Sequence, residues 1–193
     1  MSGGSHVFLE EIGDDTVVRG NSIHDTEHAG IAIYTSGRPL IEGNDISAAG
    51  GAAIEVGLQL APGIAPVIRG NTISSSVTGI EVASGAEPTI EDNQLVGNKS
   101  GIVLSGSDAS ISGDRLEGNS SGVFVMRGSP RIEGNTITGG TVGLGSGSDH
   151  ATPILTGNTI CENETNVSLI FGAVMPDTAG NEICPDAPVE ASG

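Results

Sequence analysis

Two glutamates have the residue type and placement that acid–base chemistry requires. Glu55 and Glu81 occupy equivalent places in two similar apolar segments, residues 53–56 and 79–82. A glycoside hydrolase uses two carboxyl groups roughly 5–10 Å apart, one of which is kept protonated. If the two segments lie side by side, the carboxyl groups fall within that range, and their repulsion raises the pKa of one of them. Glu55 and Glu81 are therefore the candidate catalytic pair. The alternatives are a pair that binds a ligand or a divalent cation such as calcium, and two ordinary surface charges.

Apolar side chains form a second group of candidates. We expect Val103, Phe124 and Met126 to face outward on neighbouring repeats, with Tyr34 and Ile170 in the flanking column. An exposed aromatic ring can stack on a sugar ring or anchor a protein partner. The alternative is that a turn covers these side chains from the side.

One repeat is longer than the others because it carries an apolar insertion, residues 57–65. Insertions in repeat proteins usually form loops on one face. Leu58 and Leu60 therefore join the binding candidates as part of a groove or contact. The other interpretation is that the insertion folds down over the edge of its repeat.

The sequence offers no cofactor or metal motif. Two cysteines and four scattered histidines do not have the spacing of metal ligands. Residues 145–148 (Gly-Ser-Gly-Ser) read as a turn, and the chain has no helix pattern that would place a serine nucleophile on a strand-to-helix turn. We therefore expect no cofactor, with a cation at Glu55 and Glu81 as the exception considered above.

A recurring phrase of the form Ile-x-Gly-Asn-x-Ile must position these candidates. Its copies follow one another at steps of 21 to 27 residues, a period typical of a solenoid. The phrase carries an Asn, or once an Asp, at Asn21, Asn44, Asn71, Asn93, Asp114, Asn135, Asn158 and Asn181.

Short apolar segments with period-two alternation follow each copy, for example residues 101–104 (Gly-Ile-Val-Leu). Such segments, bounded by Gly, Ser and Asp, are typical of short strands. Parallel strands joined only by turns cannot form a doubly wound sheet, whose crossovers are helices. The irregular steps differ from the strict hexapeptides of a left-handed β-helix. The sequence therefore predicts an all-β fold, a single-stranded right-handed parallel β-helix of about eight coils.

The predicted solenoid domain covers residues 6–184, and residues 185–193 form a C-terminal tail. Residues 1–5 contain neither a basic residue nor an apolar run, so we expect no signal peptide there. We interpret them as a disordered tip or a cloning remnant. We also expect the chain to be one segment of a larger protein.

Stacking of the coils turns the repeat into columns of like residues. The two Ile of each phrase would fill the core, and the Asn would lie at the bend between them, bonded to the backbone and to the next Asn. The residue before each Gly would face water, giving alternating Arg and Glu in the first four coils. The outward column of the alternating segments would comprise Phe8, Ala32, Glu55, Glu81, Val103, Phe124, Gly143 and Ser168.

The two cysteines occupy the same slot in consecutive repeats. Cys161 follows the phrase that ends at Ile160, and Cys184 follows the one that ends at Ile183. Stacked strands lie roughly 4.8 Å apart, within the reach of a disulfide. The sequence therefore predicts a Cys161–Cys184 disulfide and an oxidising compartment; two stacked buried thiols are the alternative.

The formal charge of −17 limits the partners. An acidic surface repels phosphate backbones, so we expect no nucleic-acid binding. No stretch approaches the roughly 20 apolar residues that cross a bilayer, so we expect no membrane insertion. Four Asn-x-Ser/Thr sequences matter as glycosylation acceptors only in a eukaryotic secretory host: Asn98, Asn119, Asn163 and Asn166.

The recurring phrase resembles the repeats of the right-handed parallel β-helix superfamily, which includes NosD-like periplasmic proteins and carbohydrate-binding and sugar-hydrolase domains. The resemblance covers residues 7–184 and implies the fold strongly but the function weakly. It implies that a sugar chain would lie along the strand face. The Gly-His-Gly and Arg-Ile-Lys pattern of polygalacturonases and the Asp-Pro-His-Asp pattern of alginate epimerases are both missing. A pectate-lyase-like base near a calcium cluster is missing too, because the single Lys99 lies in a turn.

The sequence therefore predicts a non-catalytic, extracytoplasmic recognition or scaffold module that binds a polysaccharide or a protein. The alternative is a polysaccharide-active enzyme, either a lyase, a glycoside hydrolase or an epimerase, that works through Glu55 and Glu81.

A solenoid needs capped ends, and no amphipathic helix precedes Val7. Self-association through the N-terminal end is therefore a further expectation.

Overall fold

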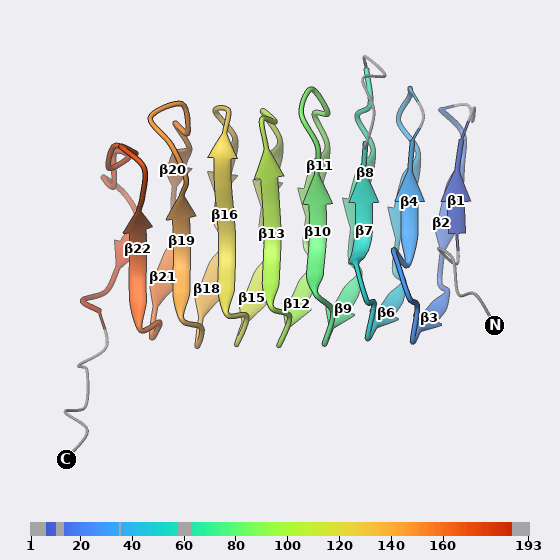
Figure 1. Ribbon diagram of the computed structural model, residues 1–193, viewed down its shortest axis with the longest axis horizontal. Coiled ribbons are helices and arrows are strands. Elements are labelled where there is room, and N and C mark those ends of the chain that lie inside the picture. The colour runs from blue at the N-terminus through green and yellow to red at the C-terminus, as the bar shows by residue number, and fades with distance from the viewer. Residues whose placement is uncertain (1–6, 11–13, 35, 58–62, 187–193) are drawn as a thin grey trace.

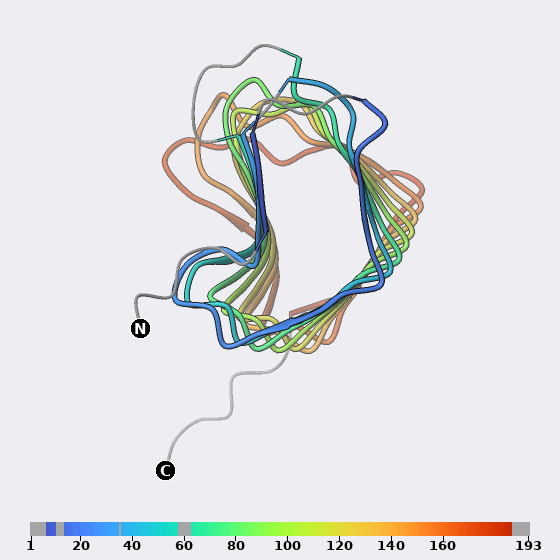
Figure 2. The same ribbon diagram turned by 90° about the vertical axis from the view of Figure 1, so that its right-hand side faces the viewer.

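A computed structural model describes residues 7–10, 14–34, 36–57 and 63–186. These residues form 23 short strands and no helix. The strands stack along the long axis of a rod, with the N-terminus at one end and the C-terminus at the other (Figure 1). Seen along that axis, successive coils superimpose around a common interior (Figure 2).

Three parallel sheets make up the wall of the rod. Sheet A consists of β1 (Val7–Leu9), β4 (Ile31–Ile33), β7 (Ala52–Val56), β10 (Thr78–Val82), β13 (Ser100–Ser105), β16 (Ser121–Arg127), β19 (Val142–Ser146) and β22 (Thr165–Leu169). Sheet B consists of β2 (Val17–Arg19), β5 (Leu40–Glu42), β8 (Val67–Arg69), β11 (Thr89–Glu91), β14 (Ser110–Ser112), β17 (Arg131–Glu133) and β20 (Ile154–Thr156). Sheet C consists of β3 (Ser22–His24), β6 (Asp45–Ser47), β9 (Thr72–Ser74), β12 (Gln94–Val96), β15 (Arg115–Glu117), β18 (Thr136–Thr138), β21 (Thr159–Cys161) and β23 (Glu182–Ile183).

Each coil contributes consecutive strands to different sheets, and every strand pairs with its equivalents in the neighbouring coils. Among the described residues, seven coils contribute to all three sheets, and an eighth consists of β22 and β23. The winding is right-handed. The predicted parallel β-helix is thus confirmed, and each recurring phrase supplies one strand of sheet B and one of sheet C.

Stacked aliphatic side chains form the core. Ile41 pairs with Ile68, and Ile46 pairs with Ile73, so each Ile of the phrase continues a column through the rod. These side chains are fully buried. β-branched residues suit such a column because they pack well on a pleated surface. The phrase therefore specifies both the strand and its register.

The second residue of β10, β13, β16 and β19 is a glycine, because this inward position of sheet A has no room for a side chain. A Cβ on Gly101 would lie 2.5 Å from the carbonyl oxygen of Gly122 and 2.8 Å from a methyl carbon of Leu116. Any larger residue would push the next coil or sheet C away. Gly143 belongs to this same inward column, because a Cβ there would meet Ile160 at 2.6 Å.

The expectation that Gly143 lies in the outward column was therefore wrong. Gly145 is the residue that pairs with Phe124. The expected register followed the apolar alternation of Val142 and Leu144. The actual register is two residues further along the strand, since the polar Ser146 occupies an inward, fully buried position opposite Val125.

An Asn ladder runs through the bend between sheets B and C, as predicted. The Asn44 backbone N–H and side-chain amide both donate to Oδ1 of Asn71, each at 3.0 Å. The same amide donates to the carbonyl oxygen of Val18 one coil earlier, also at 3.0 Å. Gly43 has a φ of 61°, so the bend requires the left-handed region that glycine adopts readily.

A second polar ladder, which the sequence interpretation missed, runs through the bend between sheets C and A. The Asn98 backbone N–H and side-chain amide both donate to Oδ1 of Asn119, at 3.0 and 2.9 Å. Asn163 and Asn166 hold the same bend near the C-terminal end. All four residues are at most 2 % exposed. Although each lies in an Asn-x-Ser/Thr sequence, the folded chain does not present any of them as a glycosylation acceptor.

The predicted disulfide joins Cys161 to Cys184 and fastens the last coil to the one before it. The S–S distance is 1.98 Å, and the Cα atoms are 4.8 Å apart. Disulfides of this kind are typical of proteins that fold in oxidising compartments.

The predicted charge ladder lies on the outer face of sheet B. Glu42 accepts from Arg19 at 2.6 Å and from Arg69 at 2.8 Å, and Arg69 lies 3.9 Å from Glu91. These side chains are partly exposed to solvent, so each pair contributes at most about 1 kcal/mol. We assign them to stability and register.

Candidate functional site

The candidate glutamates lie next to each other on the outer face of sheet A. Glu55 on β7 pairs directly with Glu81 on β10. Their Cα atoms are in register on neighbouring strands, so they are separated by roughly the 4.8 Å strand spacing. Both side chains are half-buried. The sequence pattern thus brought the two carboxylates together, although whether they react with or bind anything stays a prediction.

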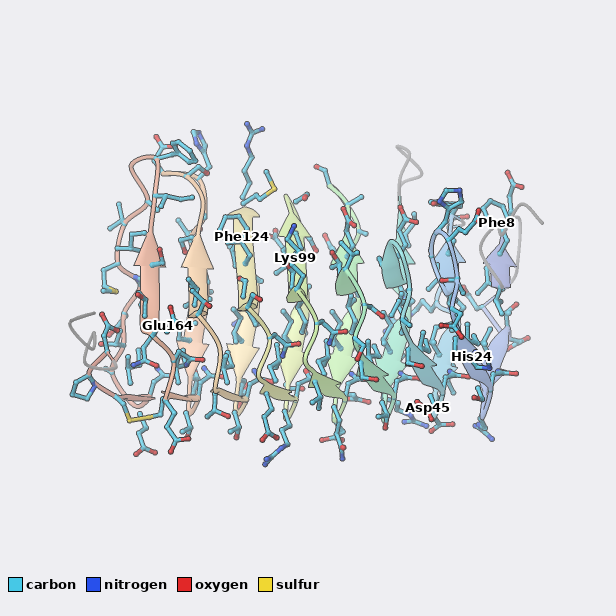
Figure 3. The ribbon with its side chains drawn as sticks, turned by 60° about the horizontal axis from the view of Figure 1, so that its bottom comes forward. Phe8, His24, Asp45, Lys99, Phe124 and Glu164 are labelled. Carbon is cyan, nitrogen blue, oxygen red and sulfur yellow. A yellow bond between two sulfur atoms is a disulfide. The ribbon has the colours of Figure 1, made fainter. Side chains whose placement is uncertain are left out.

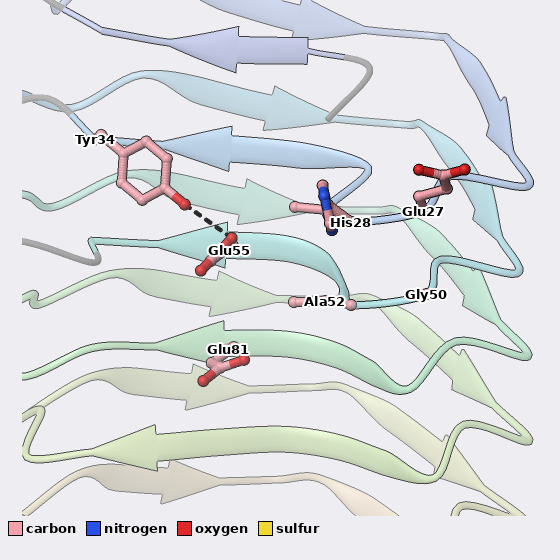
Figure 4. A pocket seen from close by; sticks show the side chains of 9 residues that line it. Glu27, His28, Tyr34, Gly50, Ala52, Glu55 and Glu81 are labelled. Atoms are coloured by element: carbon pink, nitrogen blue, oxygen red, sulfur yellow. Dashed lines mark hydrogen bonds between the residues drawn. The ribbon is translucent and has the colours of Figure 1, made fainter. Parts of the chain in front are cut away.

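Tyr34 orients one member of the pair. It lies just after β4, and its hydroxyl donates to Oε2 of Glu55 at 2.9 Å (Figure 4). The Tyr34 ring also packs against Phe8 of the preceding coil, with ring centroids 5.0 Å apart and planes tilted by 54°. This separation and tilt are typical of a favourable aromatic pair. Two aromatic rings therefore flank the carboxylates on the N-terminal side.

The environments of the two carboxyl groups differ. Burial raises the pKa of Glu81 above its ordinary value, and the negative charge of Glu55 raises it further. Burial is also the largest cause that raises the pKa of Tyr34, followed by its hydrogen bond to Glu55. The Tyr34 hydroxyl therefore remains a donor to Glu55 at neutral pH, while Glu81 takes up a proton more readily than an ordinary glutamate does.

A shallow hollow of about 390 Å³ opens beside the pair. Small residues at the start of β7, Gly50, Gly51 and Ala52, leave the space, and the carboxylates and Tyr34 form part of the lining. Glu27 and His28 line it from the turn before β4 (Figure 4). Sequence interpretation missed these two residues and did not connect Tyr34 with Glu55. The signal available was that the single Tyr of the chain lies in the repeat next to Glu55.

The apolar candidates continue the same outward column. Val103 pairs with Glu81, and Phe124 pairs with Val103. Phe124 is half-buried because its ring lies over the glycines of the next coil, with 2.5 Å between a ring carbon and the place where a Cβ of Gly145 would be. Met126 is 47 % exposed. Leu58 and Leu60 lie outside the described residues, whereas Ile64 at the end of the insertion is buried in the core.

All the aromatic side chains lie outside the core. The chain has three Phe, one Tyr and no Trp. Phe8, Tyr34 and Phe124 lie on the outer face of sheet A, with Phe8 and Phe124 five coils apart in one column (Figure 3). Phe171 lies in the turn after β22 and is 84 % exposed. Because the core uses only aliphatic side chains, packing of the interior does not explain the aromatic rings on sheet A.

One group of potential metal ligands occurs among the described residues. Ligand atoms of Cys161, Glu182 and Cys184 lie within 4.8 Å of one another. Both sulfur atoms are already joined in the disulfide, so this group is not available to bind a metal in the oxidised protein. The described part of the chain also has no helix that is long and apolar enough to cross a membrane.

Comparison with known proteins identifies the family of this chain. A search of curated proteins found no match. A family model described as the right-handed beta helix region matches residues 2–116, which is more than half of the chain. That segment contains Glu55, Glu81 and Tyr34 and the first five copies of the recurring phrase. Together with the observed coils, this match shows that the chain belongs to the right-handed β-helix family.

Proposed function

We propose that the protein is a non-catalytic, extracytoplasmic recognition module of a larger protein, and that the outer face of sheet A binds an extended polysaccharide. The placement of the aromatic rings carries this proposal: three of the four lie on that face rather than in the core. Exposed rings can cover the apolar face of a sugar ring, and carboxylates accept hydrogen bonds from its hydroxyl groups. The combination at Phe8, Tyr34, Glu55 and Glu81 is suited to such a ligand.

The length of the face and the charge of the chain limit the kinds of ligand that can bind. Phe8 and Phe124 are five coils apart, roughly 24 Å at the spacing of paired strands. An extended chain molecule can contact both ends of such a face, whereas a small molecule cannot. The formal charge of −17 disfavours a polyanion, so a neutral or amino-bearing polysaccharide is preferred. The disulfide supports an extracytoplasmic location.

Affinity electrophoresis tests the proposal, with gels that contain neutral, amino-bearing or acidic polysaccharides. We expect at least one neutral or amino-bearing polymer to retard the protein. Phe8→Ala should weaken that binding roughly tenfold, the value of one aromatic contact of about 1.4 kcal/mol. Phe171→Ala, which removes a more exposed ring that lies off this face, is the control and should bind normally. Two results contradict the proposal: the Phe171 variant loses retardation, or no polysaccharide retards the protein. If the protein binds a protein partner but no polysaccharide, the face is a protein-binding surface instead.

A second candidate function is polysaccharide cleavage by Glu55 and Glu81. The unlike environments of the two carboxyl groups favour it, because a glycosidase needs one carboxyl protonated and the other ionised. Assays for new reducing ends and for unsaturated products test this directly. Product formation that disappears in Glu55→Gln/Glu81→Gln, but persists in the sheet B control Glu133→Gln, would show that the protein is an enzyme.

Self-association through the N-terminal end is the remaining proposal. Strands β1, β2 and β3 end their sheets, and within the described residues their outer edges carry no further strand. Phe8 and Val17 in this coil are at least half exposed. Unpaired edges can add a strand from another chain. Light scattering should show a mass that rises with protein concentration; a constant monomer mass would refute this proposal.

A further inference from the structure

Asp114 is the single acid in the Asn ladder between sheets B and C. It lies at the bend between β14 and β15 and is 1 % exposed. Its Oδ1 accepts the backbone N–H of Asn93 at 2.7 Å and the Asn93 side-chain amide at 2.9 Å. Its own N–H donates to Oδ1 of Asn135 at 2.8 Å. Asp114 therefore occupies the ladder position in the same orientation as the Asn residues on either side.

The other carboxyl oxygen, Oδ2, is buried and has no hydrogen-bond partner. In Asn93 the corresponding atom is the amide nitrogen, which donates to the next ladder residue at 2.9 Å, to the carbonyl oxygen of Ile68 one coil earlier at 3.0 Å and to that of Glu91 in its own coil at 3.1 Å. By the same equivalence, Oδ2 of Asp114 faces Oδ1 of Asn135 and the carbonyl oxygens of Ile90 and Ser112. All of these groups accept hydrogen bonds, and an ionised Asp114 offers them no donor.

We propose that Asp114 is a pH-sensitive joint in the rod: as a neutral acid it donates its O–H across the ladder, and loss of that proton to solvent weakens the contact between the coils on its two sides. The neutral acid restores one of the bonds that an Asn amide would donate. The carboxylate restores none of them and places a buried charge beside oxygen atoms. A buried acceptor without a donor costs about 1–3 kcal/mol, and a buried charge costs more.

The surrounding charges favour the neutral form. On the preceding coil, Glu91 and Asp92 are both acidic; Asp92 lies so close that a Cβ on Gly113 would be 2.7 Å from its carboxylate. On the coil of Asp114 itself, Arg115 is held by Glu117 at 2.7 Å, and on the following coil the nearest charged strand residue is Glu133. No ion pair in the described chain involves Asp114.

Burial raises the pKa of Asp114 from 3.8 to about 7; the two bonds from Asn93 act against this rise, and the charges of Asp92 and Glu91 add to it. The folded-state pKa is thus above the unfolded-state value. The stabilisation by the neutral acid is fully present below the unfolded pKa and is lost as the pH rises through the folded pKa. The joint should therefore weaken progressively from about pH 4 and be fully weakened slightly above pH 7.

Amide hydrogen exchange and carboxyl ¹³C NMR test the proposal in the intact chain. Between pH 6 and pH 8, protection of the Asn93 and Asp114 amides, corrected for the intrinsic exchange rate, should fall about tenfold. Protection at the Asn44–Asn71 joint of the same molecule should stay constant, and Asp114→Asn should abolish the pH dependence. A carboxyl resonance of Asp114 that titrates near its ordinary value, or an equal loss of protection in Asp114→Asn, would overturn the proposal.

Discussion

Removal of the Cys161–Cys184 disulfide should release the last coil while the rest of the rod stays folded. The bond closes a loop of 23 residues, and the loop-entropy relation gives about 3 kcal/mol for a loop of this length at 25 °C. The segment that it fastens has few other attachments. Its strand β23 has two residues, and it pairs only with β21.

The other attachments of this segment include hydrogen bonds at two bends and the packing of Ile183 against the core. Asn158 donates to Oδ1 of Asn181 through its backbone and its side chain, at 2.9 and 2.8 Å. Asn166 donates to the carbonyl oxygens of Cys184 and Pro185, each at 3.0 Å. In a solenoid each coil contacts only its neighbours, so loss of the disulfide should act locally. The opening of residues 170–186 should become roughly 100-fold more frequent, which corresponds to about 3 kcal/mol.

Limited proteolysis and hydrogen exchange of Cys161→Ala/Cys184→Ala measure that opening. We expect cleavage and exchange within residues 170–186 to accelerate roughly 100-fold, with exchange in β4, β7 and β10 unchanged. Wild-type protein treated with a reductant is the control and should behave like the variant. Equal cleavage rates with and without the disulfide would refute the reasoning, as would acceleration spread evenly along the rod.

Three further predictions concern the ladders, the core and the site. Asn135→Ala removes buried hydrogen bonds to Asn158 and Ile111 and should lower the free energy of unfolding by about 3 kcal/mol in denaturant titrations. Asn21→Ala, at the exposed end of the ladder, should lower it by less than about 1 kcal/mol. Equal losses in the two variants would argue against a cooperative ladder. Ser146→Val replaces a buried hydroxyl that has no partner and lies between Val125 and Leu169. The free energy of unfolding, measured by thermal unfolding, should therefore rise by about 1 kcal/mol. Destabilisation would show that the site cannot accept the larger side chain. Tyr34 is the single tyrosine in a chain without tryptophan, so its ultraviolet titration is directly visible. The pKa of Tyr34 should be higher in the folded than in the unfolded protein and should fall in Glu55→Gln. An unchanged titration in that variant would exclude the bond to Glu55.

The recurring phrase made most of the fold predictable. Its two Ile positions and its Asn are set by stacking, which places the same residue type at the same point in every coil. The disulfide was predictable for the same reason, because Cys161 and Cys184 occupy one slot. The register of β19 was not, since Ser146 breaks the apolar alternation of sheet A. The constant step of seven residues from Leu116 to Val123 and from Ile137 to Leu144 does indicate the observed register.

The second ladder and the hollow were less accessible from the sequence. Ser76, Asn98, Asn119 and Asn163 each follow the first ladder by five residues, but Ala49 and Gly140 interrupt the series, so no constant residue type marks it. The hollow depends on the path of the turns at Glu27–Ala29 and Gly50–Ala52. The repeat period specifies where strands stack, whereas the path of a turn depends on its own length and backbone angles. Glu55 and Glu81 were therefore predictable as neighbours, but the contribution of His28 to the same site was not.

A hydrogen-exchange footprint tests most directly whether the outer face of sheet A is the binding surface. The protein would be compared with and without the polysaccharide that retards it most strongly in affinity electrophoresis. The account predicts added protection in β4, β7 and β10 and in the turns that line the hollow, with sheet B unchanged. Protection on sheet B or at the ends of the rod, with none around Glu55 and Glu81, would contradict it.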